Sequence, residues 1–188
     1  MKGLTIANGG DKNKRRKLDF YPTPPDATHV LMQFLNLDPC KVWECACGNG
    51  AMAEVIKEYN HSVISTDISA TEYGVSGVDF LNEYRTCDAI ITNPPFNISH
   101  EFILHATKQA GIVAMLLKSQ YWHAKKRIKL FTTNQPSYVL PLTWRPDFGG
   151  GGAPTMDVLW TVWVDGDTDT KYRLLSKPAN KLMHRTNR

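Results

Sequence analysis

The sequence lacks the long apolar run that a membrane-spanning helix needs. Such a helix takes roughly 20 consecutive apolar residues, and no stretch of the 188-residue chain approaches that length. The polar and basic residues 1–17 contain no apolar segment of the kind found in secretory signals. We therefore expect a cytoplasmic protein without a membrane partner, and the chain length suits one α/β domain with a substantial core.

Cysteine is scarce, and the pattern of the four cysteines argues against two kinds of site. Four cysteines in a chain of this size do not form a disulfide framework. Cys45 and Cys47 are separated by one residue rather than two, and no second cysteine pair follows them. We therefore expect no metal and interpret these thiols as small side chains packed around a turn.

The net charge of +4 is small, but the basic residues are clustered. A mild positive charge permits a polyanionic partner without requiring one. Clustering favours contacts with phosphate groups, although solvated surface is the alternative for any single cluster. The three clusters are Lys12, Lys14, Arg15, Arg16 and Lys17; Lys125, Lys126, Arg127 and Lys129; and Lys171, Arg173, Lys177, Lys181, Arg185 and Arg188.

Hydrophobic patterning predicts strands that alternate with helices. Such an order produces a mostly parallel sheet with helices on both faces, here with seven strands. Only a loop separates the last two strands, so we expect that pair to be antiparallel. Thr23 is expected to cap the first helix. The expected strands are 41–46, 62–68, 78–80, 88–92, 112–118, 137–142 and 158–164, and the expected helices are one after Pro24, 51–59, 98–110 and 121–131.

The chain contains no internal repeat and no sign of a second domain. Residues 1–18 lack hydrophobic periodicity and are expected to form a flexible basic arm. The folded domain is expected over residues 19–172. Residues 173–188 are expected to form a loosely ordered basic tail.

Two features stand where predicted strands end, which is where open α/β sheets bind ligands. In the loop from Glu44 to Gly50, the glycines let the backbone approach a ligand closely. The loop lacks the third glycine of the pattern G-x-G-x-x-G and a Walker lysine, so phosphate binding is not favoured. Asp67 follows the next strand, about 20 residues later, and its carboxylate can accept hydrogen bonds from ribose hydroxyls. An ordinary loop aspartate is the alternative.

The sharpest feature is Asn93-Pro94-Pro95-Phe96, which ends an apolar strand. Two successive prolines remove two backbone donors and restrict the backbone. The Asn93 side-chain oxygen and the Pro94 carbonyl can then both accept hydrogen bonds from one exocyclic amine. Phe96 offers a face on which a planar base can stack. This combination predicts methylation of an amino group on a nucleic-acid base.

These motifs, in this order, resemble those of the class I S-adenosylmethionine-dependent amino methyltransferases, which have a Rossmann-like domain. Within that class the chain is similar to the DNA adenine-N6 group, particularly the small Dam-like enzymes of phages and prophages. The likeness covers roughly residues 18–165. It implies S-adenosylmethionine as the cofactor, DNA as the partner, and the host cytoplasm as the location if a phage encodes the chain.

The resemblance also implies roles for individual residues. The tetrapeptide Asn93 to Phe96 corresponds to the catalytic motif of the family. Cofactor contacts are implied at the methionine end for Phe20, Tyr21, Thr23 and Pro24, in the glycine loop for Glu44, Ala46, Gly48 and Gly50, at the ribose for Asp67, and at the adenine for Ile68, Asp79 and Phe80.

The chain departs from the family by having no insertion long enough for a target-recognition domain. Sequence specificity is therefore expected to be short, absent or supplied by a partner. A duplex base must leave the stack to reach the site. We expect Trp144 or Phe148 to cover its second face and Lys118 and Arg145 to touch the backbone phosphates.

Several alternatives stay open at this point. The same type of tetrapeptide occurs in enzymes that methylate cytosine N4, RNA or protein glutamine. Asparagine in the first position with phenylalanine in the fourth favours adenine, and the basic clusters disfavour a glutamine substrate. A non-catalytic subunit that binds the cofactor or a nucleic acid is a further alternative. Both a monomer and a homodimer are compatible with the sequence.

Overall fold

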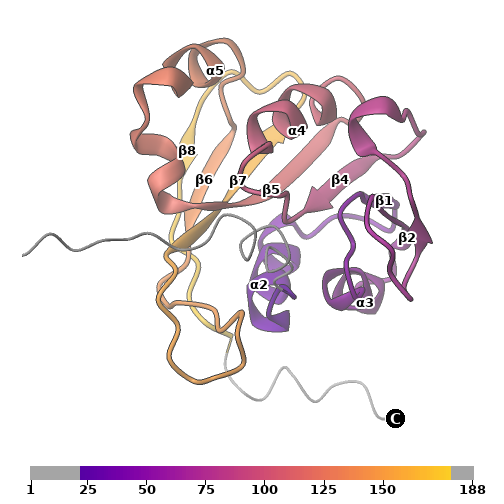
Figure 1. Cartoon of the computed structure of the whole chain (residues 1–188). Helices are drawn as coiled ribbons and strands as arrows, with labels where there is room; N and C mark the ends of the chain where they lie inside the picture. The colour runs from indigo at the N-terminus through magenta and orange to yellow at the C-terminus, as the bar shows by residue number, and fades with distance from the viewer. Residues whose placement is uncertain (1–21, 179–188) are drawn as a thin grey trace, which may run out of the picture.

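The middle strands of the sheet are apolar on both faces, which suits a sheet sandwiched between helices. The computed structural model describes residues 22–178 and contains one eight-stranded sheet, in the order β3-β2-β1-β4-β5-β7-β6-β8 (Figure 1). The strands are β1 (Lys41–Glu44), β2 (Ser62–Asp67), β3 (Val75–Ser76), β4 (Ala89–Thr92), β5 (Ile112–Lys118), β6 (Tyr138–Pro141), β7 (Val158–Val164) and β8 (Lys171–Tyr172).

Strand direction follows the prediction. Strands β1 to β5 pair in parallel, and β7 pairs antiparallel with both β5 and β6. The predicted number of seven strands is wrong, because the chain turns after β7 and adds β8 in parallel beside β6. Strand β8 has only two residues, which is too short for a period-two pattern to reveal it.

The strand predicted over 78–80 is also wrong. Its place in the sheet is taken by Val75–Ser76, and the following residues Phe80–Asn82 form a short 3-10 helix, η1. The Asp79 carboxylate accepts a hydrogen bond from the Leu81 backbone N–H at 3.1 Å. This local cap stabilises a turn, so the apolar residues there do not continue a strand.

The four α-helices within residues 22–178 cover both faces of the sheet, as predicted. Helices α2 (Pro25–Leu35) and α3 (Ala51–Glu58) lie on one side, and α4 (Ser99–Ala106) and α5 (Ile128–Thr133) lie on the other (Figure 1). The basic helix predicted over 121–131 is broken into two 3-10 turns, η2 (Ser119–His123) and η3 (Lys125–Arg127), before α5 begins. No helix within residues 22–178 is both long and apolar enough to cross a bilayer.

Two apolar clusters fill the space between the sheet and its helices. Neighbouring residues of one strand point to opposite faces, so Ile91 joins the cluster beneath α2 and α3, while Ile90 joins the cluster beneath α4. The first cluster also contains Leu175, so the chain still packs against the domain beyond β8. The predicted arm at 1–18 lies outside the described residues, as does the tail from 179.

Substitution of Trp160 tests the packing of α2 against the sheet. It is 0% exposed, and its indole N–H donates to the carbonyl oxygen of Ala27 in α2 at 2.8 Å. Trp160→Phe removes that hydrogen bond and part of the buried ring, so we expect the free energy of unfolding to fall by about 2 kcal/mol. Denaturant unfolding measures the change. Tyr172→Phe, at a 59% exposed position, is the control and should stay within about 0.5 kcal/mol of the native protein. An equally small effect for Trp160→Phe would contradict the packing.

Candidate active site

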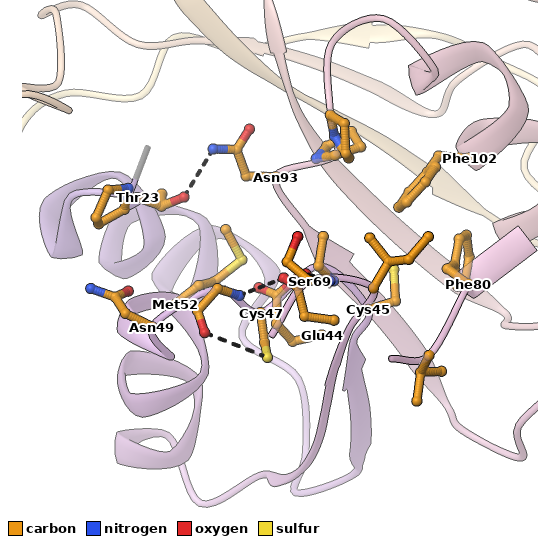
Figure 2. A pocket seen from close by; sticks show the side chains of 18 of the residues that line it. Thr23, Glu44, Cys45, Cys47, Asn49, Met52, Ser69, Phe80, Asn93 and Phe102 are labelled. Atoms are coloured by element: carbon orange, nitrogen blue, oxygen red, sulfur yellow. Dashed lines mark hydrogen bonds between the residues drawn. The ribbon is translucent and has the colours of Figure 1, made fainter. Parts of the chain in front are cut away.

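A cavity of about 420 Å³ lies at the carboxyl ends of β1, β2 and β4 (Figure 2). Small-molecule sites typically occupy roughly 300–1,000 Å³. Twelve of the residues singled out from the sequence line this cavity. They are Thr23, Glu44, Ala46, Gly48, Asp67, Ile68, Asp79, Phe80, Asn93, Pro94, Pro95 and Phe96.

Two of the expected cofactor residues are absent from the lining, and two cannot be placed. Pro24 and Gly50 lie in the described part of the chain without lining the cavity. Phe20 and Tyr21 lie outside the described residues. Sequence reasoning also missed several lining residues, which include Cys45, Cys47, Asn49, Met52, Ser69, Ile98 and Phe102. Cys45, Cys47 and Asn49 lie inside the glycine loop, so their position could have predicted a place in the cavity wall. The sequence around Phe102 predicts only a buried side chain on α4.

Asp67 holds the glycine loop in place. One carboxylate oxygen accepts from the Gly48 backbone N–H at 2.9 Å, and the other accepts from the Ser69 N–H at 2.7 Å. Because each carboxylate oxygen has a second lone pair, both can still accept a hydrogen bond from a ligand. The predicted ribose-type acid is therefore fixed at the cavity wall with accepting capacity to spare.

Gly50 has a structural reason to be glycine that does not involve a ligand. Its φ of 83° lies in the left-handed region, and a Cβ atom there would lie 2.4 Å from the ring of Tyr73. That ring sits in the loop after β2, where the Tyr73 hydroxyl contacts Glu54 and Lys57 of α3. The second glycine of the loop thus lets Tyr73 pack over the start of α3.

Phe80 and its neighbours form the apolar wall of the cavity. The Phe80 ring is 2% exposed and packs edge-on against Trp43, with ring centroids 5.0 Å apart. Phe102 of α4 lies against its other side at 4.7 Å. Asp79, beside Phe80, accepts hydrogen bonds from the Leu81 N–H and from the Asn82 side chain. These contacts place one carboxylate next to a rigid aromatic wall.

Glu44 is the most deeply buried acid of the site. It is 1% exposed, and its Oε1 atom accepts from the Thr92 hydroxyl at 2.6 Å and from the Ala46 N–H at 3.2 Å. Burial raises the pKa of Glu44 to about 7, against the opposing effect of these two hydrogen bonds. The acid therefore changes its charge near neutral pH.

The thiols beside Glu44 are protonated at neutral pH. Burial raises the pKa of Cys47 to about 12, and burial raises the pKa of Cys45 well above its usual value. Within residues 22–178, no group of three or more histidine, cysteine, aspartate or glutamate side chains is placed to hold a metal ion.

The side-chain amide of Asn93, which lines the cavity, is held by its nitrogen. Its side-chain Nδ2 atom donates to the Thr23 hydroxyl at 3.1 Å (Figure 2). The expected capping role of Thr23 is wrong, because α2 begins without a side-chain cap. Among the described residues, the Asn93 Oδ1 atom and the Pro94 carbonyl accept no hydrogen bond. The Pro95 carbonyl is used, because it accepts from Ile98 and Ser99.

Phe96 is in contact with one of the four predicted substrate residues. The Nζ atom of Lys118, at the end of β5, lies 4.0 Å from the centroid of its ring. None of the four lines the cavity itself. The Trp144 indole N–H donates to Asp26 at 3.0 Å, Arg145 pairs with Asp157 at 2.7 Å, and Phe148 packs against the cluster that contains Trp160. A substrate contact by any of the four stays a prediction.

No protein-family model and no curated protein sequence matches the chain. Solved structures do. A Pyrococcus horikoshii protein provisionally classed as an RNA methyltransferase superposes with a TM-score of 0.62 and 17% identity, over 83% of this chain and 92% of that one. A dimethyladenosine transferase from Plasmodium falciparum gives a TM-score of 0.57 and 12% identity, over 77% and 63% of the two chains.

A third similar structure contains a bound cofactor. It is the magnesium protoporphyrin IX methyltransferase of Synechocystis PCC 6803 with bound S-adenosylmethionine, at a TM-score of 0.52 and 14% identity, over 84% and 86% of the two chains. The chain shares the fold of these three structures. The predicted Rossmann-like architecture is therefore confirmed, with one strand more than expected.

The raised pKa of Glu44 predicts how stability of this methyltransferase fold depends on pH. The folded protein binds the proton more tightly than the unfolded chain, whose glutamate titrates near 4.5. The contribution of Glu44 to the free energy of unfolding is therefore fully present below pH 4.5 and is lost as the pH rises to about 7. We expect a loss of about 3 kcal/mol. Glu44→Gln keeps both accepted hydrogen bonds and should remove most of this slope.

Denaturant unfolding of both proteins between pH 4.5 and 8 measures the difference. Glu101→Gln, which changes an exposed acid of α4, is the matched control and should keep the native slope. Parallel pH profiles for the native protein and Glu44→Gln would show that Glu44 does not titrate in this range.

Proposed function

We propose that the chain transfers a methyl group from S-adenosylmethionine to the exocyclic N6 amine of adenine in DNA, by direct in-line transfer. The observation that carries this proposal is the pair of free acceptors at Asn93 and Pro94. Both belong to one tetrapeptide, both line the cavity, and neither is used by the described residues. The resemblance of the motifs to small Dam-like enzymes supports adenine N6 in DNA as the target.

An exocyclic amine is a poor nucleophile because its lone pair is delocalised into the ring. Two acceptors that bind both amine hydrogens pull the nitrogen towards a tetrahedral geometry and orient its lone pair. Thr23 acts as a positioning residue in this scheme, because it takes the Asn93 NH₂ group and leaves the Oδ1 atom as the acceptor. Phe96 provides the stacking face. The proton leaves after the methyl transfer, so no strong general base is needed.

The cavity suits the cofactor in size and in the chemistry of its wall. When bound, S-adenosylmethionine supplies an electrophilic methyl group on a sulfonium centre. Asp67 has spare acceptor capacity for the ribose hydroxyls, and Phe80 with Ile68 offers apolar surface for the adenine ring. The likeness to a methyltransferase with bound S-adenosylmethionine supports the same choice of cofactor.

Adenine in RNA is the second candidate. The structural likeness to a dimethyladenosine transferase and to a protein classed as an RNA methyltransferase favours it. Nucleoside mass spectrometry of DNA and RNA, after incubation with the protein and labelled cofactor, identifies the polymer and the base together. N6-methyladenine in DNA supports the proposal, whereas N4-methylcytosine, label in RNA alone or no label overturns it.

Asn93→Ala tests the acceptor pair. Removing one of two preorganised acceptors should lower the rate of methyl transfer by roughly 100-fold or more, while the cofactor Kd stays within a few-fold. Thr23→Val should cause a smaller loss, because the amide remains but is no longer held. Asn97→Ala, at the exposed position after the tetrapeptide, is the matched control and should keep full activity. Full activity in Asn93→Ala would refute this mechanism.

Asp67→Ala tests the cofactor site separately. Loss of a charged acceptor should weaken S-adenosylmethionine binding by about tenfold or more, which calorimetry measures. Asp88→Ala is the control, because that carboxylate also accepts from a backbone N–H, on Lys41 at the opposite edge of the sheet. Equal cofactor affinity in the two variants would remove Asp67 from the cofactor site.

A further inference from the structure

The segment that follows β5 carries a concentration of positive charge that the proposed chemistry does not use. Residues 119–133 contain no aspartate or glutamate. Lys125, Lys126 and Lys129 are exposed, and none of them forms an ion pair with the described residues. We call the surface formed by Lys118, Lys125, Lys126 and Lys129 the basic ledge.

Aromatic packing holds the basic ledge in place. Trp122 stacks on Phe131 with ring centroids 4.0 Å apart and an interplanar angle of 10°. The Arg127 guanidinium lies 3.5 Å from the Tyr121 ring centroid and donates to the Tyr121 carbonyl at 2.6 Å. Leu130 and Tyr121 are buried beneath these contacts. The lysines are thus carried by an anchored segment rather than by a free loop.

The basic ledge begins at the cavity. Its first member, Lys118, ends β5 and contacts the ring of Phe96, the last residue of the tetrapeptide. The segment then leads from the carboxyl end of β5 towards α5 (Figure 1). Ile128 is 61% exposed among the lysines and adds an apolar contact point. Unpaired cations that start beside the stacking face suit a polyanion whose base enters the cavity.

We propose that the basic ledge binds the sugar-phosphate backbone of the nucleic acid beside the target base. This inference rests on the proposed function, since it takes a nucleic acid as the substrate. Lysine contacts to phosphate add affinity without reading the base sequence. The basic ledge therefore supplies nucleic-acid affinity that does not depend on the base sequence.

The test compares two triple variants with the same change in charge. Lys125→Gln/Lys126→Gln/Lys129→Gln removes three exposed lysines of the basic ledge. Lys41→Gln/Lys108→Gln/Lys171→Gln removes three exposed lysines at the amino edge of the sheet, opposite the cavity. Binding of a fluorescent DNA duplex and of its single strand is measured over a range of salt concentrations, together with cofactor affinity by calorimetry.

We expect the ledge variant to bind duplex DNA about tenfold or more weakly, and its slope of log K against log salt to fall by about 2 to 3. The control variant should change little, and both should keep native cofactor affinity. If the two variants weaken DNA binding equally, or if the salt slope of the ledge variant is unchanged, the proposed role of the basic ledge is wrong. The proposed function is not affected by that result. Absence of nucleic-acid binding by the native protein would overturn the proposed substrate and the ledge with it. Binding of both variants to phosphatidylserine vesicles is measured in parallel. A difference between the variants seen with vesicles and not with DNA would assign the surface to membranes and refute the proposal.

Discussion

The hydrogen bond between Thr92 and Glu44 joins the two strand ends on which the whole site is built. Thr92 is the last residue of β4 and precedes the tetrapeptide, while Glu44 is the last residue of β1 and opens the glycine loop. Both side chains are buried, and the oxygen atoms are 2.6 Å apart. This contact fixes the acceptors proposed to bind the amine relative to the loop proposed to hold the cofactor.

Burial of the Glu44 carboxylate in this arrangement costs free energy whenever the group is charged. Glu44 sits where its charge is poorly solvated, which raises its pKa to about 7. Asp67, by contrast, is stabilised by two backbone donors and keeps the neighbouring glycine loop closed. The two acids lie at one cavity but have different contacts: Glu44 joins β1 to β4, and Asp67 holds the glycine loop and is proposed to accept hydrogen bonds from the cofactor.

The acceptors proposed to bind the substrate amine are uncharged, and the exposed lysines lie beside the cavity rather than in its wall. Asn93 and Pro94 line the cavity, whereas the unpaired lysines of the basic ledge start at Lys118, beside Phe96. In the proposed function, this division separates the choice of reacting atom from the affinity for the nucleic acid.

The sequence by itself determined the alternation of strands and helices, the antiparallel final pair and most of the cavity lining. These follow from local hydrophobic period and from motifs at strand ends, which parallel pairing brings to one edge. Short-range signals did not reveal the two-residue strand β8, and they misplaced the strand near Phe80, where the Asp79 cap favours a turn.

Only the tertiary structure decided which partners the site residues have. Thr23 reads as a helix cap, yet it orients Asn93 from 70 positions away. Trp144, Arg145 and Phe148 are predicted substrate contacts whose partners in the folded chain could not be read from the sequence. Trp144 bonds to Asp26, Arg145 pairs with Asp157 and Phe148 packs on the core. The physical reason is that motifs and periodicity report local backbone needs, whereas side-chain partners depend on distances that exist only after the sheet has assembled.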